Sequence, residues 1–372
     1  MDLAFSEEQE MLKKMARDFL AKECPKTLVR QMEEDDKGYT PDLWAKMAEL
    51  GWMGLAFPEA YGGGGGSFLD LAVLLEEQGR ACLPGPFFST VVLGGYTILE
   101  AGTEEQKKEF LPKISQGKEI ITLALTEPSA TYSAEGIELT ATAEGDHEIL
   151  NGTKLFVADA HVANHFIVAA KSARGGITLF IVDAKSPGIS YTLLKTIASD
   201  KQCEVVFDKV KVPKKNILGG QGKGWLVIEK ILQRAAVAKC AEMLGGAQQV
   251  LEMTVDYAKQ RVQFGKPIGS FQAIQHHCAN MAIDVDGCRF ITYQAAWMLS
   301  EGIPATKETA MAKAWTSEAY RRVTALGHQV HGGIGFIKDH DMQLYYRRAK
   351  AAEVTYGDAD FHREVVAREI GL

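Results

Sequence analysis

The sequence predicts an α+β fold in three parts: an N-terminal helical domain, a central antiparallel β-barrel or sandwich, and a C-terminal four-helix bundle. Apolar residues recur at three- and four-residue spacing at both ends of the chain, whereas between them the spacing falls to two. The strand-like runs also follow one another without helical segments, so a Rossmann-type cofactor domain is not expected. We place the domain boundaries at 1–118, 119–223 and 224–372.

The N-terminal part is expected to be helical. Ser6 and Gln9 have the spacing of a capping box ahead of the periodic run EMLKKMARDFLAKE. TPDLWAKMAELGWMGL repeats the helical period, and Gly51 is expected to end that helix. Five glycines at 62–66 indicate a loop, because no G-x-G-x-x-G unit stands between a strand and a helix there.

The central and C-terminal parts differ in the length of their periodic segments. Short β-rich runs separated by turn residues, such as HEILNGTKLFVA and CEVVFDKVKVP, predict the strands. From Gly224 onward the helical period returns in long segments, including SFQAIQHHCANMAIDVDGCRFITYQAAWML and TKETAMAKAWTSEAYRRVTALGHQVHG. Helices of this length predict a bundle.

Composition excludes several classes of function. The 372 residues carry a net charge of −7, which disfavours a nucleic-acid surface. No apolar run approaches the roughly 18 residues of a membrane span, and the acidic N-terminus is not typical of a signal peptide. Six scattered cysteines without a CxxC pair indicate free thiols in a reducing cytosol, so we expect a cytoplasmic protein without a metal site.

Three short motifs carry candidate binding chemistry. LTEP (125–128) ends a strand, RVQFGKPIGSFQAIQH (261–276) joins two long helices, and QVHGGIGF (329–336) follows a third. Each is a weak signal alone. An arginine fork suits a diphosphate, however, and paired glycines allow a ligand to approach the backbone closely.

In this order and at this spacing, the motifs resemble the acyl-CoA dehydrogenase family of flavoproteins from end to end. FSEEQEMLKKMARDFLAKE, NGTKLFV and the C-terminal VVARE add to the resemblance. It implies an acyl-CoA substrate and FAD lying between the β domain and the C-terminal bundle. It also implies electron transfer to electron-transferring flavoprotein and a homotetramer, with a heterotetramer as the alternative.

The resemblance assigns cofactor contacts to positions of this chain. The cofactor-binding positions that it implies are Thr126, Phe156, Ala158, Arg261, Phe264, Gln272, Gln329 and Gly333. Two features depart from the family pattern. The small-residue loop after TEP reads Ser129-Ala130-Thr131-Tyr132-Ser133, and the threonine that usually meets the flavin is Ala158.

The catalytic base is the largest departure. In this family a glutamate removes the α-proton while the β-hydrogen leaves as hydride to flavin N5. Ungapped alignment on RRAK and VVARE puts Tyr356 at that position, and the family's second location falls at Ala235. Asp358 is the nearest carboxylate, and we prefer it as a helix cap with a cofactor contact over a base. Tyr356 is expected to line the acyl pocket.

Three functions therefore stay open. The first is dehydrogenation of an atypical acyl-CoA, such as a cyclic, aromatic-derived or steroid-type thioester, for which relatives without the standard glutamate are known. The second is a base-deficient FAD-binding subunit of a heteromeric dehydrogenase. The third is a non-redox acyl-CoA lyase on the same scaffold.

Overall fold

The fold is described from a computed structural model of the chain, which covers residues 5–173 and 175–372. The chain forms two compact units, and neither is continuous in sequence. The helical unit comprises Met1–Arg30, Phe68–Leu83 and Gln233–Leu372, and the sheet unit comprises Gln31–Ser67 and Pro84–Leu232. The three domain boundaries expected from the sequence stay a prediction.

The N-terminal third is helical, as predicted. Its elements are α1 (Glu7–Glu23), α2 (Lys26–Glu34), α3 (Pro41–Glu49), α4 (Phe68–Ala81), a π-helix (Phe88–Gly95), α5 (Tyr96–Ala101) and α6 (Glu104–Ser115). The capping box of α1 is confirmed, because the Ser6 hydroxyl accepts from the Gln9 N–H and the Gln9 side chain accepts from the Ser6 N–H. Gly51 follows α3 with φ +75°, which confirms it as part of the helix stop.

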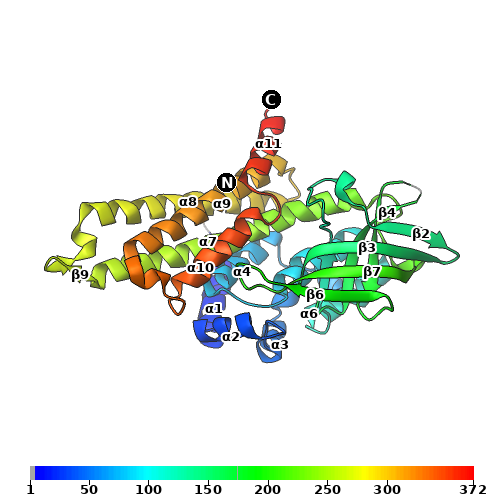
Figure 1. Cartoon of the computed structure of the whole chain (residues 1–372), viewed down its shortest axis with the longest axis horizontal. Coiled ribbons are helices and arrows are strands. Elements are labelled where there is room, and N and C mark those ends of the chain that lie inside the picture. Colours follow the sequence, from blue (N-terminus) through cyan, green and yellow to red (C-terminus); the bar gives the residue numbers. More distant parts are fainter. Residues whose placement is uncertain (1–4, 174) are drawn as a thin grey trace. The chain divides into compact units, whose positions relative to one another are not determined.

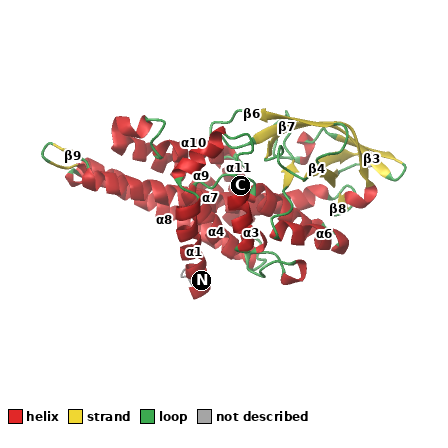
Figure 2. Cartoon of the chain, turned by 90° about the horizontal axis from the view of Figure 1, so that it is seen from below, coloured by secondary structure: helices red, strands yellow, loops and turns green. Residues whose placement is uncertain are grey.

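The central strands form one sheet (Figure 2). They are β1 (Ile121–Ala124), β2 (Thr140–Glu144), β3 (His147–Ala158), β4 (His165–Ser172), β5 (Ile177–Asp183), β6 (Ile189–Leu194), β7 (Gln202–Pro213) and β8 (Ile217–Leu218). The order across the sheet is β6-β7-β3-β2-β4-β5-β8, with β1 paired to β4. Buried aliphatic and aromatic side chains, among them Phe166, Phe180 and Phe207, form its core.

The prediction of a purely antiparallel sheet is wrong, because the sheet is mixed. β1 and β2 both run parallel to β4, whereas the β2–β3, β3–β7, β4–β5, β5–β8 and β6–β7 pairs are antiparallel. Two successive reversals, at the β2–β3 hairpin and between β3 and β4, return the chain to its first direction. β4 then pairs with β2 and not with β3. Two-residue periodicity reports a strand but carries no information on the direction of its neighbour.

Long helices form the C-terminal part, again as predicted. They are α7 (Gly224–Gln260), α8 (Gln272–Ser300), α9 (Thr306–His331), α10 (Met342–Val354) and α11 (Ala359–Glu369). A short hairpin of β9 (Val262–Gln263) and β10 (Lys266–Pro267) joins α7 to α8, and α8 runs alongside α9 (Figure 1). No helix within the described ranges is long and apolar enough to cross a membrane.

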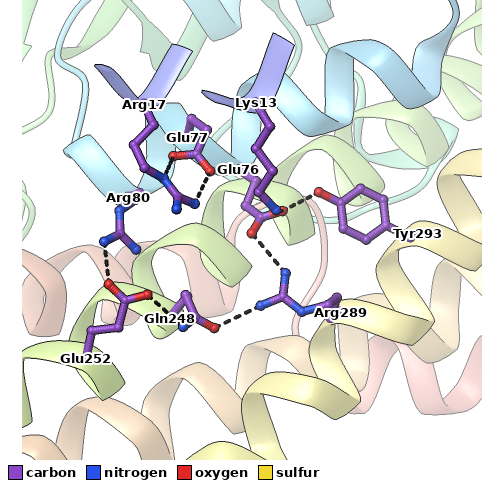
Figure 3. Close-up of polar contacts among 9 residues, drawn as sticks. All are labelled: Lys13, Arg17, Glu76, Glu77, Arg80, Gln248, Glu252, Arg289 and Tyr293. Atoms are coloured by element: carbon purple, nitrogen blue, oxygen red, sulfur yellow. Dashed lines mark hydrogen bonds and ion pairs between the residues drawn. The ribbon is translucent and has the colours of Figure 1, made fainter. Parts of the chain in front are cut away.

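A buried ionic network joins α1, α4, α7 and α8 inside the helical unit (Figure 3). Glu76 on α4 accepts hydrogen bonds from Lys13 at 2.9 Å, from Arg289 at 3.1 Å and from the Tyr293 hydroxyl. Its side chain is only 2% exposed. Burial by itself would raise the pKa of Glu76, but Lys13, Arg289 and Tyr293 outweigh it, so the pKa lies below its ordinary value.

The network continues along α4 and into α7. Glu77 binds Arg17 through two bonds of 2.7 and 2.9 Å, in the forked geometry that arginine forms with carboxylates. Arg289 also donates to Gln248 at 2.8 Å, and Gln248 donates to Glu252, which pairs with Arg80. Each buried carboxylate therefore has a cationic partner, which is the condition under which buried charge is tolerated.

Helices α4 and α7 cross with their backbones in contact. A Cβ placed on Gly245 would lie 1.7 Å from the carbonyl oxygen of Glu76, and one on Gly79 would lie 2.0 Å from that of Glu242. Both obstacles are backbone atoms, which cannot swing aside as a side chain can. The two glycines thus set the distance at which α4 and its two buried glutamates sit against α7.

We expect Gly245→Ala to destabilise the protein by about 1–3 kcal/mol or more, because the added methyl group forces the α4–α7 backbones apart. Gly287→Ala on α8 is the matched control, since its Cβ would meet only the half-exposed indole of Trp315 at 2.7 Å. With that indole displaced, the better helix propensity of alanine should leave the control neutral or more stable. Urea unfolding of both variants makes the comparison, and equal midpoints would contradict the backbone-contact explanation.

Candidate active site

The sheet unit brings together two of the predicted cofactor positions, Thr126 and Phe156. The N–H of Leu155 donates to the carbonyl of Thr126 at 2.8 Å, which joins the loop after β1 to β3. The β3–β7 register shifts between Lys154 and Val157, and inside this bulge Phe156 has φ +54° and a side chain that is 54% exposed. Ala158 ends β3 opposite Gln202. A bulge of this kind redirects a side chain out of the strand's regular alternation.

A buried ion pair supports this loop. Lys154 donates to Glu127 at 2.6 Å and to the carbonyl of Leu125 at 3.1 Å, while Glu127 accepts from the N–H groups of Glu138 and Leu139. The two side chains are 0% and 3% exposed. Burial lowers the pKa of Lys154 to about 8, although Glu127 acts in the opposite direction. Glu127 therefore shapes the TEP loop as a structural residue.

The hairpin between α7 and α8 carries Arg261 and Phe264. Phe264 and Gly265 both have positive φ at the tip, +53° and +77°, and the Phe264 side chain is 92% exposed. Two residues with positive φ are typical of the tightest hairpin turns. Arg261 is exposed, and no carboxylate of the described residues pairs with its guanidinium.

The other helical cofactor positions lie at helix ends. Gln272 opens α8, Gln329 is in the last turn of α9, and Gly333 follows in a 3-10 turn (Gly332–Phe336). The ring of Tyr257 near the end of α7 stacks on His331 with centroids 4.5 Å apart, so the ends of α7 and α9 lie together. The structure thus brings Arg261 and Gln329 to one end of the helical unit.

The 355–358 turn joins α10 to α11 and contains the predicted catalytic positions. Tyr356 has φ +60° and Gly357 has φ +93°. The Asp358 carboxylate accepts from the N–H of Phe361 at 2.8 Å, which confirms its role as the N-cap of α11. Ala235, the alternative position for a base, is a fully buried residue of α7. Whether Asp358 or Tyr356 takes part in catalysis stays a prediction.

Sequence reasoning missed two side chains that hold this turn. Lys313 on α9 donates to the Gly357 carbonyl at 2.8 Å, and His362 on α11 lies 2.9 Å from the Tyr356 carbonyl. Lys313 stands among alanines, in AMAKAWTS, on the buried side of its helix. A lysine at a core position of a helical period was the available signal, since lysine is almost never fully buried unless it is paired.

The residues present suit an anionic dinucleotide. The guanidinium of Arg261 has no carboxylate partner within the described part of the chain. The exposed amides of Gln272 and Gln329 make no hydrogen bond there either. A Cβ at Gly333 would meet nothing within 4 Å, so its backbone is open to approach. These groups supply the charged fork and the accessible backbone that a diphosphate requires.

Comparison with known proteins supports the same assignment along the whole chain. Three family models match: acyl-CoA dehydrogenase N-terminal domain over residues 6–118, middle domain over 122–210 and C-terminal domain over 222–371. A caffeyl-CoA reductase–Etf complex subunit from Acetobacterium woodii is 34% identical, with 98% of both chains covered.

Solved structures agree with the sequence matches. The chain resembles butyryl-CoA dehydrogenase from Megasphaera elsdenii with a TM-score of 0.93, 33% identity and full coverage of both chains. It also resembles a chain of the ChsE4–ChsE5 complex from Mycobacterium tuberculosis with a TM-score of 0.92 and 29% identity, over 100% of this chain and 99% of that one.

We expect Glu127→Gln to destabilise the sheet unit by about 3–5 kcal/mol, because it leaves the buried Lys154 ammonium without its counter-charge. Lys211→Met is the control. It removes the exposed Lys211–Glu144 pair, whose side chains are 64% and 62% exposed, and should change nothing measurable. Chemical denaturation followed by a sheet-unit probe tests both variants. A Glu127→Gln protein as stable as wild type would contradict the role given to the pair.

We expect Asp358→Asn to retain stability and cofactor content, because asparagine caps a helix as well as aspartate does. Asp358→Ala should lose about 1 kcal/mol through the missing cap. Flavin content and turnover, measured on both variants beside wild type, separate the two roles of Asp358. If the asparagine variant held a full complement of flavin but had no turnover, Asp358 would be the base and the cap interpretation would be insufficient.

Proposed function

The chain belongs to the acyl-CoA dehydrogenase family, and from this premise we propose that it oxidises the Cα–Cβ bond of an atypical acyl-CoA thioester. Membership makes it an FAD-dependent oxidoreductase of the acyl-CoA dehydrogenase type. The proposal concerns the substrate, which we assign to the cyclic, aromatic-derived or steroid-type thioesters, and the residues that handle its α-proton.

The observation that carries the substrate proposal is the chemistry of the 355–358 turn. Position 356 holds a tyrosine, and the alternative position holds the buried methyl group of Ala235. A phenol, whose ordinary pKa is about 10, is a poor base at neutral pH. Asp358, the carboxylate closest to position 356 in the sequence, caps α11. We therefore propose that this chain handles a substrate whose α-proton is removed from a direction other than the usual one.

The remaining groups of the site have defined tasks under this proposal. Bound FAD supplies the hydride acceptor, its N5 atom. The backbone N–H of position 356 donates to the thioester oxygen and stabilises the negative charge that develops as the α-proton leaves. Arg261, Gln272, Gln329 and Gly333 hold the dinucleotide, and the Tyr356 side chain borders the acyl group. Thr126, Phe156, Phe264 and Ala158 complete the cofactor contacts.

We also propose the partners and the compartment. Electron-transferring flavoprotein is the electron acceptor, a proposal favoured by the name of the Acetobacterium woodii relative, a subunit of a reductase–Etf complex. The assembly is a homotetramer, in line with the family resemblance. Free thiols at all six cysteines favour the reducing cytosol.

One comparison favours a second candidate, a base-deficient FAD-binding subunit of a heteromeric dehydrogenase. The structural relative from Mycobacterium tuberculosis is a chain of a two-protein complex. In such an assembly this chain would contribute part of the cofactor site, and a partner would contribute the base. Neither expected position of the base holds a glutamate, since one is Tyr356 and the other is Ala235. This is compatible with a base supplied by the partner.

The deciding experiment uses the chain purified alone. We expect a yellow protein with about one FAD per subunit whose flavin absorbance bleaches with one class in a panel of straight, branched, cyclic, aromatic and steroid CoA thioesters. A flavin-free chain that stays colourless after FAD is added would support the heteromeric subunit. A flavin-loaded chain that converts a thioester without bleaching would indicate a lyase. Bleaching by straight-chain thioesters alone would overturn the substrate proposal.

A further inference from the structure

Lys313 is a fully buried lysine, and within residues 5–173 and 175–372 no carboxylate is among its hydrogen-bond acceptors. It sits in the middle of α9, and its side chain is 0% exposed. Its ammonium donates to the carbonyls of Ala352 at 3.1 Å, Glu353 at 3.2 Å and Gly357 at 2.8 Å, and to the Ser317 hydroxyl at 2.9 Å. Three of these four acceptors are backbone oxygens of one short segment, residues 352–357.

The chemistry of these acceptors explains why a lysine stands there. Ala352 and Glu353 lie in the last turn of α10, where carbonyls lack the usual i+4 partner and lie at the negative end of the helix dipole; Ala352 also accepts from the N–H of Thr355 at 3.3 Å. An ammonium has three donors and no acceptor, which suits a cluster of carbonyls. Burial lowers the pKa of Lys313 to about 8, so the group is still mainly protonated at neutral pH. Because the same ammonium also binds Gly357, it ties the 355–358 turn to the end of α10.

His362 holds the same turn from the opposite helix. Its Nε2 lies 2.9 Å from the Tyr356 carbonyl, which can only accept, so Nε2 carries the proton and donates. Burial lowers the pKa of His362 to about 4, and the nearby Lys313 charge adds to that effect, although the bond to Tyr356 acts in the opposite direction. The imidazole is therefore neutral at physiological pH, in a single tautomer set by its acceptor.

The turn needs these two bonds because its backbone is strained. Tyr356 has φ +60°, in the left-handed region that costs a residue with a Cβ about 1–2 kcal/mol. Conformations of this kind persist only where the surroundings hold them, and they concentrate at functional sites. Here the carbonyl of the strained residue is fixed by His362, and the next carbonyl is fixed by Lys313. Without them the carbonyls of Tyr356 and Gly357 lose the hydrogen bonds that set their directions.

We propose that Lys313 and His362 form a turn clamp, a pair of positioning residues that orients the backbone of Tyr356 toward the thioester. This inference rests on the proposed function, in which the N–H of position 356 meets the thioester oxygen. It adds that two buried side chains on α9 and α11 hold the backbone on both sides of that N–H, at the carbonyls of 352–353 and of 356–357, and in this way determine where it points. Neither residue touches the reacting atoms, so their contribution appears in the rate of chemistry and not in the binding of the CoA moiety.

The main test replaces the ammonium with an uncharged chain of similar length. We expect Lys313→Met to lower the rate of flavin bleaching by about 10- to 100-fold through misplacement of the turn, with FAD content unchanged. KM should stay within about threefold, because the CoA contacts are not altered. Hydrogen exchange should speed up in peptides covering 350–364 but not in those covering α8. Ser317→Ala removes the one acceptor that lies outside residues 352–357 and is the matched control, with all readouts near wild type.

A second pair of variants tests the other half of the clamp, and still decides the question if Lys313→Met does not fold. His362→Phe keeps an aromatic ring but cannot donate to the Tyr356 carbonyl, so it should reproduce the rate loss and the faster exchange. His362→Gln restores an N–H donor and should recover at least part of the rate. If His362→Gln bleaches no faster than His362→Phe, His362 does not have the positioning role proposed for it.

The exchange measurement separates failure of this inference from failure of the proposed function. Suppose that none of the thioesters bleaches the wild-type flavin, but Lys313→Met still speeds up hydrogen exchange in 350–364. The clamp then exists and the proposed reaction is wrong. If wild type is active and Lys313→Met matches it in rate and exchange, the clamp is wrong and the proposed reaction stands. If Lys313→Met speeds up hydrogen exchange equally across the whole helical unit, Lys313 contributes to the stability of that unit in general and has no specific role at the turn.

Discussion

The helical unit depends on one buried carboxylate, that of Glu76. Glu76 on α4 receives a lysine from α1 and an arginine and a tyrosine from α8, while its own backbone lies against Gly245 of α7. An unpaired carboxylate at this depth would cost several kcal/mol, so the four helices are stable together only in the alignment that brings all three donors to it. That alignment also sets the frame on which α9 and α11 present the 355–358 turn.

Both units solve the same problem, which is to hold an irregular loop in one conformation, with a buried lysine. In the sheet unit Lys154 binds the Leu125 carbonyl and Glu127, next to the bulge that exposes Phe156. In the helical unit Lys313 binds three carbonyls around the 355–358 turn. A lysine can reach several backbone oxygens at once because it is long and has three donors. In each unit the hydrogen bonds of the buried ammonium offset the energetic cost of burying its charge, and the same bonds hold the loop in one shape.

Under the proposed function, the side chain and the backbone N–H of position 356 have separate roles, and this separation explains how the site could tolerate a tyrosine in place of a glutamate. A side-chain base at position 356 can be exchanged in one mutation, whereas the backbone N–H at the same position stays as long as the turn keeps its shape. Lys313 and His362, which help to keep that shape, are buried and lie outside the three binding motifs of the sequence. Under the proposed function, substrate range changes with the side chain at Tyr356, while Lys313, His362 and the Asp358 cap keep the backbone of the turn in place.

Local patterns in the sequence were sufficient for the helices, the strands, the capping box of α1 and the Asp358 cap, because each depends on residues within a few positions of one another. They were also sufficient to place Arg261, Gln329 and Gly333 in recognisable motifs. Strand direction, the α4–α7 contact and the roles of Lys154 and Lys313 were decided only by the tertiary structure. These features join residues dozens to hundreds of positions apart, and periodicity records which side of an element is buried but not which partner covers it.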